Sequence, residues 1–180
     1  MWVAWNRTRS LVQFNGVRYD ILQDSDGNPI LLSATLRLFI RRAECEWTDP
    51  DLAIHSLSRT FEEDEATWEC SEYDDYGACR QWRQLGLPPA VLPDYEKEPS
   101  GVAQIHQGQL NWLEFDILSD VIEFMNKPYD LTLGYLVKKV CEHGPGCISF
   151  WSCEGGRCPE LKIRMRTDCP PVPEEPEGKF

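Results

Sequence analysis

The chain has 180 residues, of which 42% are hydrophobic and 27% charged, so we expect a folded globular domain rather than a disordered segment. The 30 acidic residues outnumber the 18 basic ones and give a formal net charge of −12. That charge argues against nucleic acid and against an anionic membrane surface as partners. The sequence has no run of 18 apolar residues, so no transmembrane helix is predicted.

The beginning of the chain carries two signals about where the protein is found. The apolar stretch within residues 1–10 is too short for a signal peptide, so we expect either that a leader has been removed or that the chain is part of a longer protein. Asn6 begins the triplet Asn-Arg-Thr, which is an acceptor sequence for N-glycosylation and favours a secreted protein.

The clearest predicted strand covers residues 31–42, where apolar side chains alternate with others. One face carries Ala34, Leu36, Leu38 and Ile40, and the other carries Thr35, Arg37, Phe39 and Arg41. This alternation is typical of an antiparallel strand with one buried and one solvated face. We therefore interpret Arg37 and Arg41 as solvated charges. A shorter alternation predicts another strand over residues 10–15.

Residues 24–29 have the composition of a turn, because Asp, Gly, Asn and Pro all favour turns. Asp24, Asp26 and Asn28 also match the first half of a calcium-binding loop. The later glutamate of such a loop is replaced by Ser33, so we favour a plain turn and expect no cofactor, with calcium as the alternative.

Two further features resemble parts of enzyme sites but do not predict one. His55 lies on a predicted strand over residues 52–58 and has no accompanying nucleophile motif, so we interpret it as structural. Residues 62–65 are four consecutive acids within a predicted loop. A glycosidase needs two carboxylates across a cleft, which one local run cannot supply. We therefore predict that the protein is not an enzyme.

Residues 69–111 are the least regular part of the chain, and we interpret them as a long loop insertion that packs or functions. The candidate glycan-binding aromatic residues of this segment are Tyr73, Tyr76, Trp82 and Tyr95. Rings of this kind can stack on sugars, or they can simply cover the sheet beneath them.

The second half of the chain reads as strands around one short helix. The predicted strands are residues 110–117, 131–138, 148–153 and 161–166. A helix over residues 120–127 is predicted to be capped by Ser119 and ended by Pro128. We expect a single domain over residues 1–166, followed by a Pro- and Glu-rich tail over residues 167–180.

The eight cysteines are an even number, and two interpretations compete: disulfides and metal thiolates. The predicted strand at residues 148–152 would hold Cys141 and Cys147 roughly 15–20 Å from Cys153 and Cys158, too far apart to share one zinc. We therefore favour disulfides, which imply an oxidising, extracellular compartment. The predicted pairs are Cys70–Cys79, Cys141–Cys147 and Cys153–Cys158, each bracketing a short segment, with Cys45–Cys169 by remainder.

Seven stretches, taken together and in order, resemble the DNRLRE (disaggregatase-related) domain and its allied carbohydrate-binding modules. They are RSLVQFN, ILLSATLRLFIRRA, EDEATW, NWLEFDILSDVIEFMN, LTLGYLVKK, ISFWSCEGG and PELKIRM, and they span residues 9–166. The family has a further strand before the first of these stretches. Here either residues 1–6 or a neighbouring chain would supply it. Members of the family do not usually carry these cysteines.

This resemblance implies an all-β, jelly-roll-like antiparallel β-sandwich with no catalytic residues. Members of the family are non-catalytic modules of secreted and surface proteins, some of which bind polysaccharides such as alginate. We therefore expect a structural or adhesive module that associates with itself or with other extracellular proteins. The alternative is a carbohydrate-binding module that uses the loop aromatics, with Arg37 and Arg41 against an acidic polysaccharide.

Overall fold

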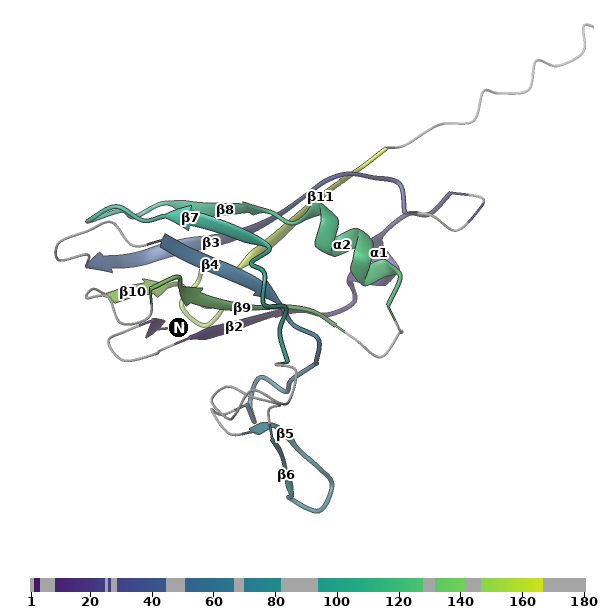
Figure 1. Ribbon diagram of the computed structural model, residues 1–180, viewed down its shortest axis with the longest axis horizontal. Coiled ribbons are helices and arrows are strands. Elements are labelled where there is room, and N and C mark those ends of the chain that lie inside the picture. Colours follow the sequence, from purple (N-terminus) through teal and green to yellow (C-terminus); the bar gives the residue numbers. More distant parts are fainter. Residues whose placement is uncertain are drawn as a thin grey trace, which may run out of the picture.

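The computed structural model describes residues 2–3, 9–24, 26, 29–44, 51–66, 70–81, 94–127, 132–141 and 147–166. These residues form a sandwich of two antiparallel β-sheets (Figure 1), which confirms the predicted all-β class. The strands are β1 (Trp2–Val3), β2 (Ser10–Phe14), β3 (Leu31–Glu44), β4 (Asp51–Ser56), β5 (Cys70–Tyr73), β6 (Cys79–Gln81), β7 (Gly101–Gln104), β8 (Trp112–Asp116), β9 (Leu133–Lys139), β10 (Cys147–Phe150) and β11 (Glu160–Met165). The helices are α1 (Val17–Asp20) and α2 (Leu118–Met125).

The order of strands in the two sheets is that of a jelly roll. Sheet I contains β1, β10 and β3 in that order, with β11 in line with β10 and β8 on the opposite side of β3. Sheet II has the order β2-β9-β4-β7. Most successive strands lie in opposite sheets, so the chain wraps around the core as a double Greek key does. β5 and β6 form a separate two-stranded hairpin.

The core is built by the alternation predicted for β3. Ala34, Leu36, Leu38 and Ile40 all have no exposed surface and face sheet II. Inward side chains of sheet II, among them Leu52, Ile54 and Tyr135, complete the packing. Because side chains alternate across a strand, the intervening residues of β3 must lie on the outer face of sheet I.

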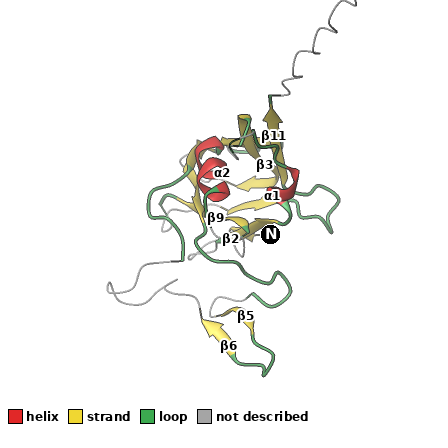
Figure 2. Ribbon diagram, turned by 90° about the vertical axis from the view of Figure 1, so that its right-hand side faces the viewer, coloured by secondary structure: helices red, strands yellow, loops and turns green. Residues whose placement is uncertain are grey.

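One end of the sandwich is closed by α2, as Figure 2 shows. Val121 and Phe124 turn into the core. Arg18 of α1 stacks on the Phe124 ring at 4.3 Å and donates to the carbonyl oxygens of Phe124 (2.6 Å) and Met125 (3.1 Å). A cation at the end of a helix satisfies unpaired carbonyl groups and opposes the helix dipole.

Burial of polar groups beneath α2 favours their neutral forms. Burial raises the pKa of Asp120, although hydrogen bonding to Ser100 and Tyr135 opposes part of the effect. Burial also raises the pKa of Tyr135, and the nearby Asp120 carboxyl adds to this.

Two predictions of local structure are wrong in detail, and one helix was not predicted. The segment expected to be a loop insertion contains β7, which pairs with β4 in sheet II, as well as the β5–β6 hairpin. Ser119 does not cap α2, which already begins at Leu118. Asp116 instead accepts a hydrogen bond from the Leu118 N–H at 3.1 Å. Residues 17–20 form the short helix α1, which was not predicted.

The further strand that the resemblance predicts before residue 9 is formed by the chain itself. β1 pairs with β10 in the registers Trp2↔Ser149 and Val3↔Ile148. In this structure the edge of sheet I is therefore covered by the chain's own first residues, and strand addition by a neighbour is not needed there.

Two of the predicted disulfides are present and one is not. Cys70–Cys79 and Cys153–Cys158 are bonded, whereas Cys141 and Cys147 are free thiols. Cys141 follows β9 of sheet II and Cys147 begins β10 of sheet I, so the two cysteines belong to strands of different sheets. Facing sheets are ~10 Å apart, whereas a disulfide needs Cα atoms at ~4.4–6.8 Å. Cys45 and Cys169 lie outside the described residues.

In the described residues, no helix is long and apolar enough to cross a membrane.

The core assignment predicts unequal effects of two nearby leucines on the same strand. Leu36→Ala should lower the free energy of unfolding by about 2–5 kcal/mol, because Leu36 has no exposed surface. Leu32→Ala should change it by less than about 0.5 kcal/mol, because Leu32 is 53% exposed. Urea unfolding followed by tryptophan fluorescence measures both values. Equal losses would contradict the burial assigned to these two side chains.

The disulfide assignment predicts three classes of cysteine in native protein treated with a thiol-alkylating reagent. Cys141 should react quickly because it is exposed. Cys147 should react slowly, because burial and the neighbouring Glu44 carboxylate raise its pKa and thiolate is the reacting form. Cys70, Cys79, Cys153 and Cys158 should react only after reduction. Peptide mass spectrometry reads out all six, and a Cys141–Cys147 linked peptide would overturn the assignment.

Candidate functional site

The outer face of sheet I carries a cluster of arginine and aromatic side chains that we call the cation–aromatic face. It consists of Arg37, Phe39 and Arg41 of β3, Trp112 of β8, and Trp151 and Arg157 from the loop between β10 and β11. The register Phe39↔Trp112 and Arg37↔Glu114 places side chains from β3 and β8 next to each other on this side.

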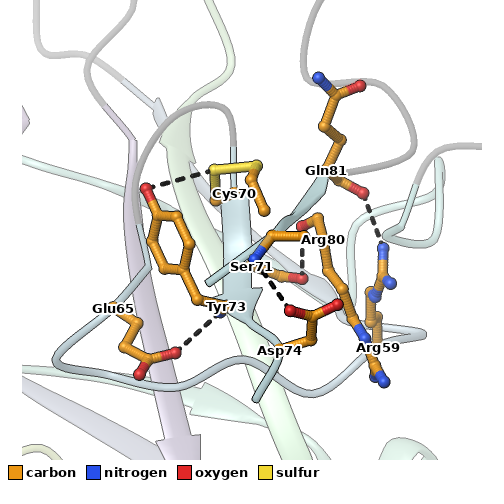
Figure 3. Close-up of a disulfide and its surroundings, with 10 residues drawn as sticks. Arg59, Glu65, Cys70, Ser71, Tyr73, Asp74, Arg80 and Gln81 are labelled. Atoms are coloured by element: carbon orange, nitrogen blue, oxygen red, sulfur yellow. Dashed lines mark hydrogen bonds between the residues drawn. A yellow bond between two sulfur atoms is a disulfide. The ribbon is translucent and has the colours of Figure 1, made fainter. Parts of the chain in front are cut away.

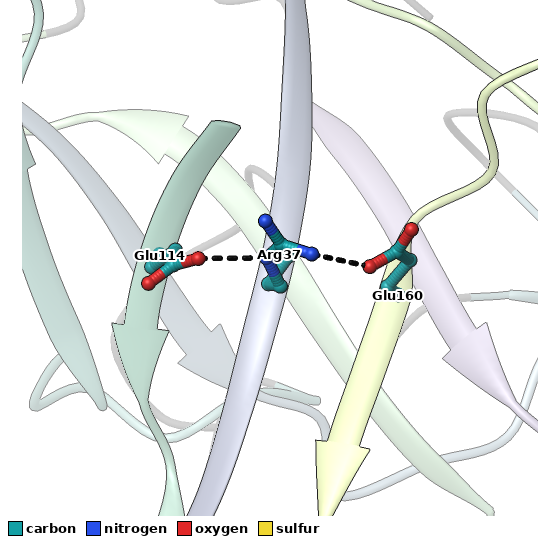
Figure 4. Close-up of polar contacts among 3 residues, drawn as sticks. All are labelled: Arg37, Glu114 and Glu160. Carbon is teal, nitrogen blue, oxygen red and sulfur yellow. Dashed lines mark hydrogen bonds and ion pairs between the residues drawn. The ribbon is translucent and has the colours of Figure 1, made fainter. Parts of the chain in front are cut away.

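Arg37 lies at the centre of this face between two carboxylates (Figure 4). Its Nε donates to Glu114 Oε1 at 2.7 Å, and one terminal nitrogen donates to Glu160 Oε2 at 2.6 Å. The guanidinium also stacks over the Trp112 ring at 4.3 Å. The Arg37 side chain is only 14% exposed, so its interpretation as a solvated charge is wrong. It links the three strands β8, β3 and β11.

Each aromatic ring of the face is covered by a cation or by another ring. Phe39 meets Trp112 edge to face, with ring centroids 5.1 Å apart. Arg157 lies over Phe39 at 3.9 Å, and Arg41 lies over Trp151 at 5.1 Å. Such stacks stabilise the surface and place guanidinium groups where they can meet an anion.

The loop that supplies Trp151 and Arg157 is fixed by the Cys153–Cys158 disulfide. β10 and β11 pair with successive parts of β3 and not with each other, so this loop bulges out between two strands that are in line. A Cβ at Gly155 would lie 2.6 Å from Cε3 of Trp151, so only glycine lets the loop rest on that ring. The loop therefore presents Arg157 to the face in a defined position.

On the opposite side of the sandwich, residues 61–66 and 70–81 form a projecting unit that we call the arm. Its base packs on the outer face of sheet II, where Leu57 and Phe61 bury the outward side chain of Leu136. The Arg59 guanidinium ties the base together by donating to the Gln81 carbonyl at 2.8 Å and pairing with Asp94 at 3.7 Å.

The arm is held internally by the Cys70–Cys79 disulfide and by backbone contacts (Figure 3). Ser71, which has no exposed surface, donates its hydroxyl to the Arg80 carbonyl at 3.0 Å. Glu65 accepts a hydrogen bond from the Tyr73 N–H at 2.8 Å, which joins the acidic segment to the hairpin.

The tip of the arm is a fixed turn. One carboxylate oxygen of Asp74 accepts hydrogen bonds from the N–H groups of Tyr76 (3.0 Å) and Ala78 (2.8 Å). Gly77 has a φ of 75°, a conformation that favours glycine. Tyr76 is consequently presented from a rigid tip with 95% of its surface exposed.

The aromatic residues predicted to bind glycans do not form one platform. Tyr76 and Tyr73 (43% exposed) belong to the arm. Tyr95 lies at the edge of sheet II, where its ring meets His55 at 5.4 Å and the Lys138 ammonium at 5.4 Å. Trp82 lies outside the described residues. The sequence pointed to these four aromatic residues. It did not predict that Phe39, Trp112 and Trp151 form a cluster, although the strands that carry them were predicted.

The remaining predicted site residues give little sign of chemistry. Asp24 accepts a hydrogen bond from the Asp26 N–H at 3.0 Å, as in an Asx turn, while Asn28 and Asn6 lie outside the described residues. His55 is buried, with Nδ1 2.9 Å from the Glu96 carbonyl oxygen. Within the described ranges, no group of three or more His, Cys, Asp or Glu side chains is placed to hold a metal ion.

No protein-family model matches this chain, and no curated protein sequence matches it either. The resemblance to the DNRLRE domain therefore stays a prediction.

The geometry of Arg37 predicts that it stabilises the fold more than a nearby surface arginine. Arg37→Ala should lower the free energy of unfolding by about 1–2 kcal/mol, because two hydrogen bonds to partly exposed carboxylates and one ring contact are lost. Arg42→Ala should cost less than about 0.5 kcal/mol, because both partners of its ion pair with Glu44 are about half exposed.

Arg37→Lys, measured in the same unfolding assay, separates the contribution of the positive charge from that of the planar guanidinium group. Lysine keeps the charge but cannot reach both carboxylates with a planar fork, so it should recover only part of the stability lost in Arg37→Ala. Full recovery by lysine, or equal costs of Arg37→Ala and Arg42→Ala, would contradict the bridging role of the guanidinium.

Proposed function

We propose that this chain is a non-catalytic, secreted β-sandwich module with a structural or adhesive role, which assembles with copies of itself or with other extracellular proteins. The observation that carries this proposal is the arm, a stapled hairpin that projects from the sandwich and presents an exposed tyrosine on a fixed turn. Tyrosine is among the residues that contribute most to protein interfaces.

The rigidity of the arm supports a binding role over a covering role. A loop that only covered the sheet would bury its aromatic residues, whereas Tyr76 is almost fully exposed. The disulfide and the Asp74 hydrogen bonds fix the tip before any partner arrives. Binding by such a segment loses little conformational entropy, because that cost was already met on folding.

The covalent chemistry supports an extracellular compartment. Two disulfides occur among the described cysteines, and disulfides persist in oxidising surroundings. The Asn6 sequon favours the same compartment. Secretion also fits the acidic charge, which keeps an extracellular protein well solvated.

The cation–aromatic face favours a second candidate function, binding of an acidic polysaccharide. Arg41 and Arg157 are exposed and could pair with uronate or sulfate groups. Stacking of sugar rings is less favoured here, since guanidinium groups already lie over Phe39 and Trp151.

Truncation of the tip tests the proposed function. Sedimentation velocity over a range of protein concentrations should reveal reversible association of the wild-type chain, and Tyr76→Ala should weaken it about tenfold. Tyr19→Ala is the matched control, because Tyr19 is 89% exposed but lies on α1. A wild-type chain that stays monomeric throughout and is retained on an acidic polysaccharide gel would favour the second candidate instead.

A further inference from the structure

The charge of the outer face of sheet I differs from that of the rest of the molecule. The register of β11 with β3 places Lys162 opposite Thr35 and Arg164 opposite Ser33, on the same side as Arg37 and Arg41. The acidic residues that these strands place on this side are Glu44, Glu114, Asp116 and Glu160; Arg37 engages Glu114 and Glu160, and Arg42 pairs with Glu44. In a chain of net charge −12, this surface is therefore positive.

The positive charges of this surface are available for binding. Arg41, Arg157, Lys162 and Arg164 are all exposed. Within the part of the chain that the structure describes, these four side chains form no ion pair. Unpaired cations beside a rigid aromatic surface favour an anionic partner.

The arm has the complementary chemistry. Glu62, Glu63, Asp64 and Asp75 are exposed, and Tyr76 is exposed in the turn at the tip. The hydrogen bond from the Tyr73 N–H to Glu65 keeps the acidic segment beside the hairpin, so the carboxylates and the tyrosine form one unit.

The arm of a molecule cannot reach its own basic surface, because the two lie on opposite sides. The base of the arm packs on the outer face of sheet II through Leu57, Phe61 and Leu136, whereas the basic surface is the outer face of sheet I. Both views draw the arm projecting away from β11 (Figures 1 and 2).

We propose that the acidic arm of one copy docks on the basic outer face of sheet I of a second copy, which consists of the cation–aromatic face together with Lys162 and Arg164. This inference rests on the proposed function and names the partner and the two surfaces. Because the two surfaces differ and lie on opposite sides, the contact is heterologous, and repetition builds head-to-tail chains or rings rather than a closed dimer.

An acidic protein segment fits this surface better than a sugar does. The rings of the face are already covered by guanidinium groups and by each other, which leaves charge as the main means of recognition. A hairpin tip buries less than the ~1,200 Å² of a standard interface, so each contact should be weak. It should weaken further as salt is raised from about 0.01 M to about 1 M, where the Debye length falls to ~3 Å.

Paired charge reversals test this contact. The face variant carries Lys162→Glu and Arg164→Glu, and the arm variant carries Glu63→Lys and Asp64→Lys. All four side chains are exposed, so both variants should fold, as circular dichroism and the unfolding midpoint will verify. Each variant alone should associate at least ~10-fold more weakly than wild type, because like charges then meet.

A mixture of the two variants makes the test specific. The unchanged arm of the face variant meets the unchanged face of the arm variant, and the two reversed surfaces also attract each other. The 1:1 mixture should therefore recover association in sedimentation velocity. Lys97→Glu is the control for the added negative charge, because Lys97 is exposed but lies outside both surfaces, and it should change the association constant less than Lys162→Glu does.

The outcomes separate this inference from the proposed function. Wild-type association that both variants retain would overturn the arm-to-face contact and leave self-assembly standing. A wild-type chain that never associates would overturn both. Loss of association in each variant without recovery in the mixture would also overturn the contact. A last outcome would assign the surface to a glycan. The wild type would not self-associate but would be retained on an acidic polysaccharide gel, and only the face variant would lose that retention.

Discussion

The whole structure depends on one long strand with two different faces. β3 runs through the middle of sheet I and pairs with β8, β10 and β11. Its even-numbered side chains from Ala34 to Ile40 are fully buried, and the odd-numbered ones form the outer surface. Because the period of a strand is two residues, a shift of register by one would expose the core and bury the arginines. The same alternation therefore fixes both the hydrophobic core and the cation–aromatic face.

Arg37 shows how the outer face acquires stability of its own. A single surface ion pair contributes little, but this guanidinium is mostly covered, contacts two carboxylates and rests on a tryptophan. The two acids come from β8 and β11, which are distant in sequence and meet only across β3. The bridge thus reinforces the strand order that brings its members together, and it organises the surface on which the exposed cations lie.

Sequence patterns predicted what depends on neighbours along the chain and missed what depends on neighbours across the sheets. The alternation in β3 identified the buried residues because burial there is periodic. Arg37 looked solvated because Glu114 and Glu160 lie far away in sequence. The predicted Cys141–Cys147 disulfide failed for a related reason: nothing local reveals that β9 and β10 belong to different sheets. The Cys70–Cys79 pair could be predicted because both cysteines belong to one hairpin.

The two disulfides of the described residues lie on opposite sides of the sandwich. Among the described residues, neither disulfide joins the two sheets of the sandwich. One fixes the arm on the side of sheet II, and the other fixes the loop that holds Arg157 over Phe39 on the side of sheet I. Both of these cross-links add rigidity to projecting segments rather than to the packed core, and a rigid segment loses less conformational entropy on binding. An acidic arm and a basic surface, each fixed in this way on opposite sides, are the features that a head-to-tail assembly requires.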